Sequence, residues 1–594
     1  MSKSAAIAGL LFVGLFLTAI ASADSVSDNW NDFLHYTKIG RLDMAKGYGR
    51  DLVDSNPDPA VILELSRNNP NAVILLQRAA DNEHDKELAS LASQVLGFIE
   101  QGKFGRRTDS SIIAEEIRRL STTTRGRLAA VERLRNSGEY AIPFMLDALA
   151  DPSRREEAPN IIWTLPQIGR DAIRPLAAAL QTDNTAVKAE IIKALGGIGY
   201  PQSLAYLKFV VEQDNSADLR ELAAQSIHKI DPAASVLPAA ELFYQLAESY
   251  YYRIDSLSPA EDADFANIWF WDAQGRNLTK MQVSREYFYE LMAMRACEWA
   301  LRADPDFGKA IGLWIAAFFK AESVGLSMPE YFGQGHADAM TYAKTAGPEY
   351  LHQALARAIK DNNAHIALNV VEALAVNAGE KSLMFRVATE QPLLAALTFD
   401  DKAVRYSAAI AIAAAGPQEI FAENRIVIKN LSQALAEDGS KKTDNFTAEQ
   451  AESYALRAAN VLLKLAIERN PVIDIGQAEN ALINAANDKR EQIRLLAIQI
   501  LAHLRTAEAQ QSIASIALTA SNPMNIRLAA FDALVTSAKI NGSLLNDPTI
   551  DSIYSLVGSK QTDPQIRGAA ASVFGALNLP SQKVKDLILD QARS

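Results

Sequence analysis

A helical motif recurs along this chain at offsets of 32 and 33 residues, and it constrains the fold more than any other feature. Each copy has an aliphatic residue, then Arg or Lys, then apolar or small residues three to four and seven to eight positions later. That spacing places the apolar residues on one face of an α-helix. The six copies begin at Val187, Leu219, Val404, Ile493, Ile526 and Ile566.

An earlier apolar helix precedes each copy across a polar turn. Two such helices, at 141–149 and 172–180, match each other at an offset of 31 residues. A helix pair of this length cannot bury its apolar face alone, so it must stack on neighbouring pairs. The full chain of 594 residues is also too long for a single hydrophobic core. We therefore expect an all-α fold, an α-solenoid of stacked helix pairs.

The motif resembles the HEAT-repeat family, especially its short bacterial form. That form has Asp in the turn and Val-Arg-x-x-Ala-x-x-Ala-Leu in the second helix. Asp214 and Arg220 have the family's six-residue Asp–Arg spacing, and so do Asp488 and Arg494. The resemblance implies that these pairs form a structural ladder between adjacent repeats, so that the arginines stabilise the array rather than bind a ligand. Where the spacing is shorter, as from Asp183 to Lys188, we expect the ladder to be interrupted.

A second resemblance, to tetratricopeptide repeats, occurs in two places. Ala45 and Pro57 are twelve residues apart, as are Ala293 and Pro305, which is similar to the second helix of that repeat.

Taken together, these patterns predict a signal peptide and four further regions. These are 1–23, signal peptide; 24–110, tetratricopeptide-like helices; 111–235, a HEAT-like array; 236–346, tetratricopeptide-like helices with an inserted hairpin near 267–283; and 347–594, a second HEAT-like array.

Three consecutive aromatic residues, Trp269, Phe270 and Trp271, lie in the predicted hairpin and are our candidate interaction residues. The segments 267–272 and 277–283 are expected to be its two strands, joined by a turn. Alternation along a strand places both tryptophans on one face and the phenylalanine on the other. One interpretation is an exposed anchor for a protein or glycan partner. The interpretation that we favour is burial of the tryptophans against the helices around 250–252.

The first 23 residues are typical of a secretory signal. Lys3 is followed by an apolar segment over 5–20, and a small-x-small pattern ends at Ala23. We predict cleavage between Ala23 and Asp24, with an uncleaved anchor as the alternative. The apolar segment is shorter than the roughly 20 residues that a membrane span needs. We therefore expect a periplasmic or otherwise exported protein with no stable membrane span after signal removal. The resemblance to the short bacterial HEAT form, together with the lack of disulfides, implies a bacterial envelope.

The sequence shows no constellation of residues that supports a reaction. The seven histidines lack metal-motif spacing, and Cys297 is the single cysteine, which we expect to be buried on a helix face. No phosphate-binding glycine loop or G-x-S-x-G motif occurs. The net charge of −12 does not favour nucleic acid as a partner. We predict no catalytic, cofactor-binding or metal-binding residues, no cofactor, and no enzyme activity.

The function expected from these features is that of a non-catalytic protein–protein interaction scaffold or adaptor acting outside the cytoplasm. The first alternative is a glycan-binding structural component of the cell envelope, which requires Trp269 and Trp271 to be exposed on a flat face. The second is a HEAT-like lyase-type enzyme, because some HEAT-like proteins are associated with phycobilin lyases; the predicted export argues against it. A polar loop over 437–447, ending in a capping box of Thr447 and Gln450, is a further segment that could contact a partner.

Overall fold

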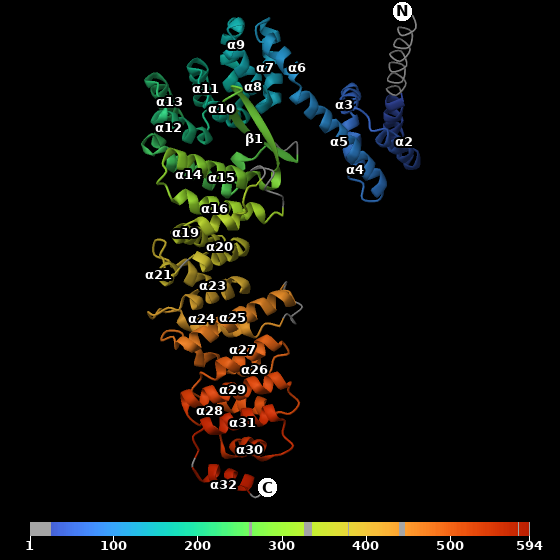
Figure 1. Ribbon diagram of the computed structural model, residues 1–594. Helices are drawn as coiled ribbons and strands as arrows, with labels where there is room; N and C mark the ends of the chain where they lie inside the picture. Colours follow the sequence, from blue (N-terminus) through green and yellow to red (C-terminus); the bar gives the residue numbers. More distant parts are fainter. Residues whose placement is uncertain are drawn as a thin grey trace, which may run out of the picture. The chain divides into compact units, whose positions relative to one another are not determined.

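The computed structural model describes residues 25–259, 264–325, 335–377, 379–438, 446–579 and 581–592, which are helical apart from one β-hairpin (Figure 1). The described chain forms two compact units, Met1–Met292 and Ala293–Ser594. The division falls within helix α15 (Arg285–Ala303). The prediction of an all-α chain of helix pairs with one small inserted hairpin is confirmed. The predicted signal peptide and its cleavage site at Ala23 and Asp24 lie outside the described residues and stay predictions.

The first unit begins with a helix over 25–38 and a bundle of four more helices. These four are α2 (Leu42–Asp54), α3 (Pro59–Asn68), α4 (Ala72–Ala80) and α5 (Lys86–Thr108). Helices α2, α3 and α4 all pack on the long helix α5. Trp30 and Phe33, both fully buried, anchor the core of this bundle. This N-terminal bundle thus packs around one long helix.

Helix pairs with the predicted repeat follow in the first unit. They are α6 (Ser110–Arg119) with α7 (Thr124–Ser137), α8 (Ala141–Ala150) with α9 (Ala158–Thr164), α10 (Ile173–Ala179) with α11 (Thr185–Ile198), and α12 (Leu204–Gln213) with α13 (Ala217–Ile230), followed by α14 (Ala239–Tyr251). Short 3-10 helices join them: η1 (Gly138–Tyr140), η2 (Pro152–Arg154), η3 (Leu165–Ala172), η4 (Pro201–Ser203), η5 (Pro232–Val236) and η6 (Asp255–Leu257). Helix α13 packs both on its partner α12 and on α11 of the preceding pair, which is the stacking that the repeat requires.

The hairpin consists of β1 (Phe265–Asp272) and β2 (Asn277–Ser284), paired antiparallel. Trp269 lies opposite Lys280, and Trp271 lies opposite Leu278. Both strands and the turn therefore agree with the prediction. Helix α15 begins directly after β2, and the Ser284 hydroxyl accepts a hydrogen bond from the backbone N–H of Glu286 at 3.2 Å, as expected for a capping serine.

The second unit continues with helix pairs and no strand in its described part. Its elements after α15 are α16 (Lys309–Glu322), α18 (Ala339–Thr345), α19 (Pro348–Lys360), α20 (Ala364–Asn377), α21 (Glu380–Leu383), α22 (Pro392–Ala396), α23 (Lys402–Ala415), α24 (Asn424–Leu435), α25 (Ala448–Glu468), η7 (Ile475–Ala478), α26 (Glu479–Ala485), α27 (Glu491–Leu501), α28 (Ala507–Leu518), α29 (Met524–Asn541), α30 (Asp547–Gly558), α31 (Pro564–Ala576) and α32 (Ser581–Ala592). The second helix of each pair packs on the second helix of the following pair. These second helices are, in order, α20, α23, α25, α27, α29 and α31 (Figure 1). Each pair thus contacts its neighbours along the array.

The arginine of the repeated motif binds the end of the first helix in its own pair or the turn that follows it. Arg220 donates to the carbonyl oxygen of Asp214 at 2.8 Å, and Arg405 donates to that of Phe399 at 2.7 Å. The same arrangement joins Arg494 to Ala486, Arg527 to Ala517 and Arg567 to Thr562. Carbonyls at a helix end lack intrahelical donors and carry partial negative charge, so a guanidinium is a favourable partner. The arginines are therefore structural, as predicted.

The expected Asp–Arg side-chain pairs, however, do not form. The Asp214 carboxylate accepts from Lys188 of the preceding pair at 2.9 Å, and Asp488 pairs with Arg490 at 2.8 Å. Arg494 reaches forward to Asn522 of the next pair at 2.6 Å. Contacts between adjacent repeats thus exist, but with partners other than those implied by the family pattern, because the arginine side chains are already engaged by backbone carbonyls.

Candidate functional site

The hairpin is fixed in the first unit by Glu139, a buried carboxylate that is 6% exposed. Glu139 accepts hydrogen bonds from the indole of Trp269 at 2.9 Å and from the amide of Asn267 at 2.6 Å. The guanidinium of Arg174 lies 3.4 Å from it. A buried charge is costly unless it is paired and hydrogen-bonded, and these three donors meet that requirement.

Aromatic contacts extend this attachment. Phe265 of β1 packs edge-on against Phe104 of α5, whose ring also contacts Tyr140. The ammonium of Lys280 lies 4.3 Å from the centre of the Tyr140 ring, a cation–π arrangement. Burial lowers the pKa of Lys280. The hairpin consequently packs on α8 and α10.

Two parts of the prediction for the aromatic residues have different outcomes. Burial is correct for Trp269, which is 5% exposed, while Phe270 and Trp271 are half-buried. The prediction that the tryptophans pack against the helices around 250–252 is wrong. The HEAT-like helices take that place because Glu139 supplies the acceptor that a buried indole N–H needs.

Trp271 lines a cavity of about 490 Å³ in the first unit. Helices α8, α10 and α11 and the hairpin form its walls, and its apolar lining includes Leu146, Val187, Ile191 and Leu278. Asp147, Asp183 and Arg276 are the charged residues that line it. The sequence pointed to Trp271 through the aromatic triplet, but it gave no indication of the residues that Trp271 would face.

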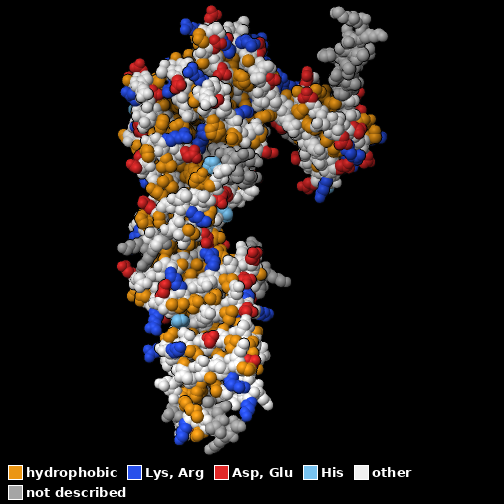
Figure 2. Space-filling view, in the orientation of Figure 1, with side chains coloured by type: hydrophobic (Ala, Val, Ile, Leu, Met, Phe, Trp, Pro, Cys, Tyr) orange, Lys and Arg blue, Asp and Glu red, His pale blue; other side chains and the backbone are white. Residues whose placement is uncertain are grey.

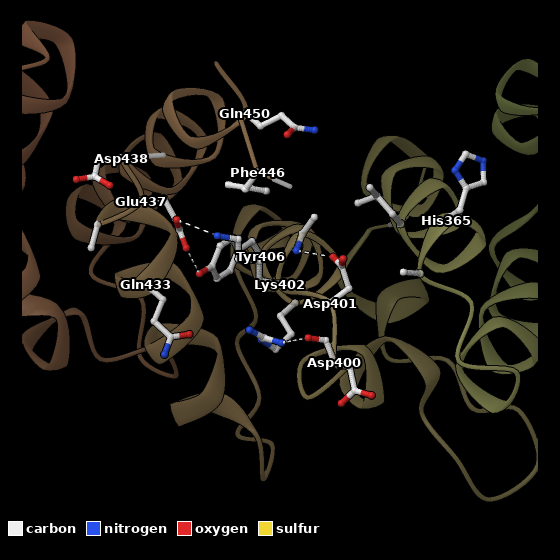
Figure 3. A pocket seen from close by; sticks show the side chains of 15 residues that line it. His365, Asp400, Asp401, Lys402, Tyr406, Gln433, Glu437, Asp438, Phe446 and Gln450 are labelled. Atoms are coloured by element: carbon white, nitrogen blue, oxygen red, sulfur yellow. Dashed lines mark hydrogen bonds and ion pairs between the residues drawn. The ribbon is translucent and has the colours of Figure 1, made fainter. Parts of the chain in front are cut away.

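A larger groove of about 870 Å³ lies in the second unit (Figure 3). It is formed where three successive helix pairs present the turns between their first and second helices. Its lining comes from the start of α20, the start of α23, the end of α24 and the start of α25. The residues labelled in Figure 3 are His365, Asp400, Asp401, Lys402, Tyr406, Gln433, Glu437, Asp438, Phe446 and Gln450.

Charged side chains in this groove hold its walls together. Glu437 accepts from Lys402 at 3.1 Å and from the Tyr406 hydroxyl at 2.8 Å, as Figure 3 shows. The Lys402 ammonium also lies 4.2 Å from the centre of the Phe446 ring. Asp401 caps α23 through the backbone N–H groups of residues 403 and 404. These contacts fix α23 to α24 and leave a preformed hollow between them.

The sequence predicted one side of this groove. Thr447 and Gln450 form the expected capping box at the start of α25. Residues 439–445 of the predicted polar loop lie outside the described residues. Burial lowers the pKa of His365, which favours the neutral imidazole. The cluster of Lys402, Tyr406 and Glu437 was missed because Glu437 follows α24, the other two residues lie on α23, and only stacking brings them together.

Three further chemical features concern the described residues alone. Within the described residues, no group of three His, Cys, Asp or Glu side chains is placed to hold a metal ion. Cys297 is fully buried, as expected. No helix in the described part of the chain combines the length and apolarity that a bilayer crossing requires. On the face shown in Figure 2, Lys and Arg are interspersed with Asp and Glu.

Comparison with known proteins supports the repeat assignment. Residues 142–228, which include the helices beneath the hairpin, match the family model of HEAT repeats. HEAT repeats typically form non-catalytic scaffolds that bind other proteins. No curated protein matches the chain.

Solved structures with a related helical arrangement include an engineered protein, at 13% identity and a TM-score of 0.22, over 92% of this chain and 99% of that one. The karyopherin Kap121p, bound to the extreme C-terminus of the protein phosphatase Cdc14p, is 14% identical with a TM-score of 0.24, over 95% and 68% of the two chains. SYS-1 is 11% identical with a TM-score of 0.25, over 94% and 100%.

Proposed function

We propose that this chain, with its HEAT repeats at 142–228, is a non-catalytic scaffold that binds other proteins outside the cytoplasm. The observation that carries the proposal is the groove of the second unit. Its Lys402, Tyr406 and Glu437 side chains are engaged with one another and hold a preformed surface between stacked helix pairs. A preformed concave surface reduces the ordering cost of binding, which suits recognition of a partner segment.

Action outside the cytoplasm rests on the predicted signal peptide with cleavage between Ala23 and Asp24. The glycan-binding alternative required two exposed tryptophans on a flat face, and Trp269 is buried against Glu139. The lyase-type alternative calls for a pocket with several titratable residues near 236–346, and the predicted export argues against it. In the groove, Glu437 is held by Lys402 and Tyr406, which supports a preformed binding surface.

The experiment that tests this proposal compares partner capture by the full mature chain and two variants. Ala436 is an exposed groove residue, and replacing it with Trp would fill the hollow without entering the core. Ala507 is an exposed residue at the start of α28, and Ala507→Trp is the matched control. Each protein is used as bait in the envelope fraction of the native host, with recovered proteins quantified by mass spectrometry.

We expect wild type and Ala507→Trp to recover the same proteins and Ala436→Trp to lose at least one of them. Equal recovery by all three baits would show that the groove does not bind the partner. Recovery of no specific protein, together with retention on envelope glycan, would overturn the scaffold function. N-terminal sequencing of the mature protein tests export, and a chain that starts at Asp24 is the expected result.

A further inference from the structure

The cavity beside Trp271 has an apolar wall and a polar rim. Leu146, Val187, Ile191 and Leu278 line it together with Trp271. Val187 and Ile191 belong to the buried core of the first unit, so the wall is fixed by packing. The volume of about 490 Å³ lies in the range in which proteins enclose small organic groups. A single large apolar side chain, with the backbone that carries it, fits such a space.

The charged side chains at this cavity have no charged partner among the described residues. Among the described residues, the side chains of Asp147, Asp183 and Arg276 form no ion pair or hydrogen bond, and the Trp271 indole N–H has no acceptor. Two carboxylates against one guanidinium give this lining a net negative charge. Partial desolvation raises the pKa of Asp147, because nearby protein atoms displace water. A cation brought by a ligand would compensate for this loss of water.

We infer that the cavity beside Trp271 binds a peptide segment of a partner protein in which a large apolar side chain adjoins a lysine or arginine. The apolar side chain occupies the space against Trp271, and the cation faces Asp147 and Asp183. The indole N–H of Trp271 is available to a backbone carbonyl of the segment. That the occupant belongs to a protein rests on the proposed function, but this cavity is separate from the groove at Tyr406 in the second unit.

The test is calorimetric titration of the full mature chain with short blocked peptides. Three peptides carry one Phe followed by Lys, Gln or Glu, and a fourth carries Lys without the Phe. The expected order of affinity is Lys, then Gln, then Glu, with no binding of the fourth peptide. For a charge pair that stays partly solvated, the preference for Lys over Gln is on the order of three- to fivefold.

Four variants separate the contributions. Asp147→Asn should remove most of the preference for Lys over Gln, while Asp218→Asn, an exposed carboxylate on α13, should leave it unchanged. Arg276→Gln should strengthen binding of the Lys peptide, because it removes a like charge. Trp271→Ala should weaken binding of all three Phe peptides. Thermal melts and circular dichroism verify that each variant is folded.

The inference is overturned if none of the Phe peptides binds the wild type, or if Asp147→Asn keeps the full preference for Lys. It is also overturned if envelope oligosaccharide binds and is displaced by none of the peptides. These outcomes leave the capture experiment with Ala436→Trp unaffected, since that variant alters the other unit. The two proposals can therefore fail independently.

Discussion

The indole N–H of Trp269 donates to the Oε2 atom of Glu139 at 2.9 Å, although the two residues are 130 positions apart. This bond joins the inserted hairpin to the end of a HEAT-like helix pair. Asn267 and Arg174 contact the same carboxylate, so one buried acid organises donors from β1 and α10. The hairpin is in this way a fixed wall of the cavity at Trp271.

The first prediction concerns this carboxylate. Glu139→Gln removes the negative charge opposite Arg174. It also introduces an amide N–H donor where the neighbouring side chains are themselves donors. The substitution should therefore destabilise the first unit by about 1–3 kcal/mol. Urea unfolding followed by tryptophan fluorescence measures the loss. Glu132→Gln, at an exposed position on α7, is the control and should change the unfolding free energy by less than about 0.5 kcal/mol. Equal effects of the two substitutions would contradict the role assigned to Glu139.

The second prediction uses two glycines of the same helix. A Cβ at Gly102 of α5 would lie 2.3 Å from the backbone oxygen of Pro59, whereas a Cβ at Gly105 would meet nothing within 4 Å. Gly102→Ala should therefore destabilise the N-terminal bundle by about 1–3 kcal/mol. Gly105→Ala should stabilise it by about 0.5–1 kcal/mol, because alanine is the better helix former. Thermal unfolding should show shifts of opposite sign, and shifts of the same sign would exclude the close approach of α3 to α5.

The third prediction concerns the repeated arginine. Arg405 donates to the carbonyls of Phe399 and Asp400, so Arg405→Gln should reduce the unfolding free energy of the second unit by about 1 kcal/mol. Arg425, on the exposed face of α24, serves as the control, and Arg425→Gln should have little effect. Chemical unfolding of both variants makes the comparison. If the two are indistinguishable, the arginine does not stabilise the helix end as we describe.

The fourth prediction is a dependence of stability on pH. His352 is fully buried, and its Nε2 atom lies 2.8 Å from the carbonyl oxygen of Ser382. Burial lowers the pKa of His352 below its ordinary value of 6.5. The folded state therefore resists protonation of His352. The contribution of the neutral imidazole to the free energy of unfolding is fully present above pH 6.5 and is lost as the pH falls below that value.

His352→Gln keeps a donor for Ser382 but cannot titrate. The melting temperature of the wild type should fall between pH 7.5 and pH 5.5 by more than that of His352→Gln. Partial desolvation also lowers the pKa values of His365 and His503, but both residues are present in both proteins, so their effects cancel in the comparison. Equal falls in the two proteins would show that His352 is not the group responsible.

The sequence predicts those features that arise locally or from periodicity. The stacked helix pairs follow from the repeated motif, and the hairpin follows from alternation and its turn. Burial of Trp269 follows from the same alternation, but its partner Glu139 does not, because the two residues are 130 positions apart and only the stacking of the helices between them brings them together. Family resemblance correctly assigns the arginines a structural role, yet Arg220 binds a backbone carbonyl instead of the Asp214 carboxylate. The groove at Tyr406 depends on packing between helices, which no local pattern encodes.

The central claim is that the groove of the second unit contacts another protein outside the cytoplasm. The most direct test places a photo-crosslinking amino acid at Gln433, an exposed groove residue, in the full chain within its native host. Glu508, exposed on α28, is the control position. We predict a discrete protein adduct in the envelope fraction at position 433 and none at position 508. The same adducts at both positions, or none at 433, would contradict the account.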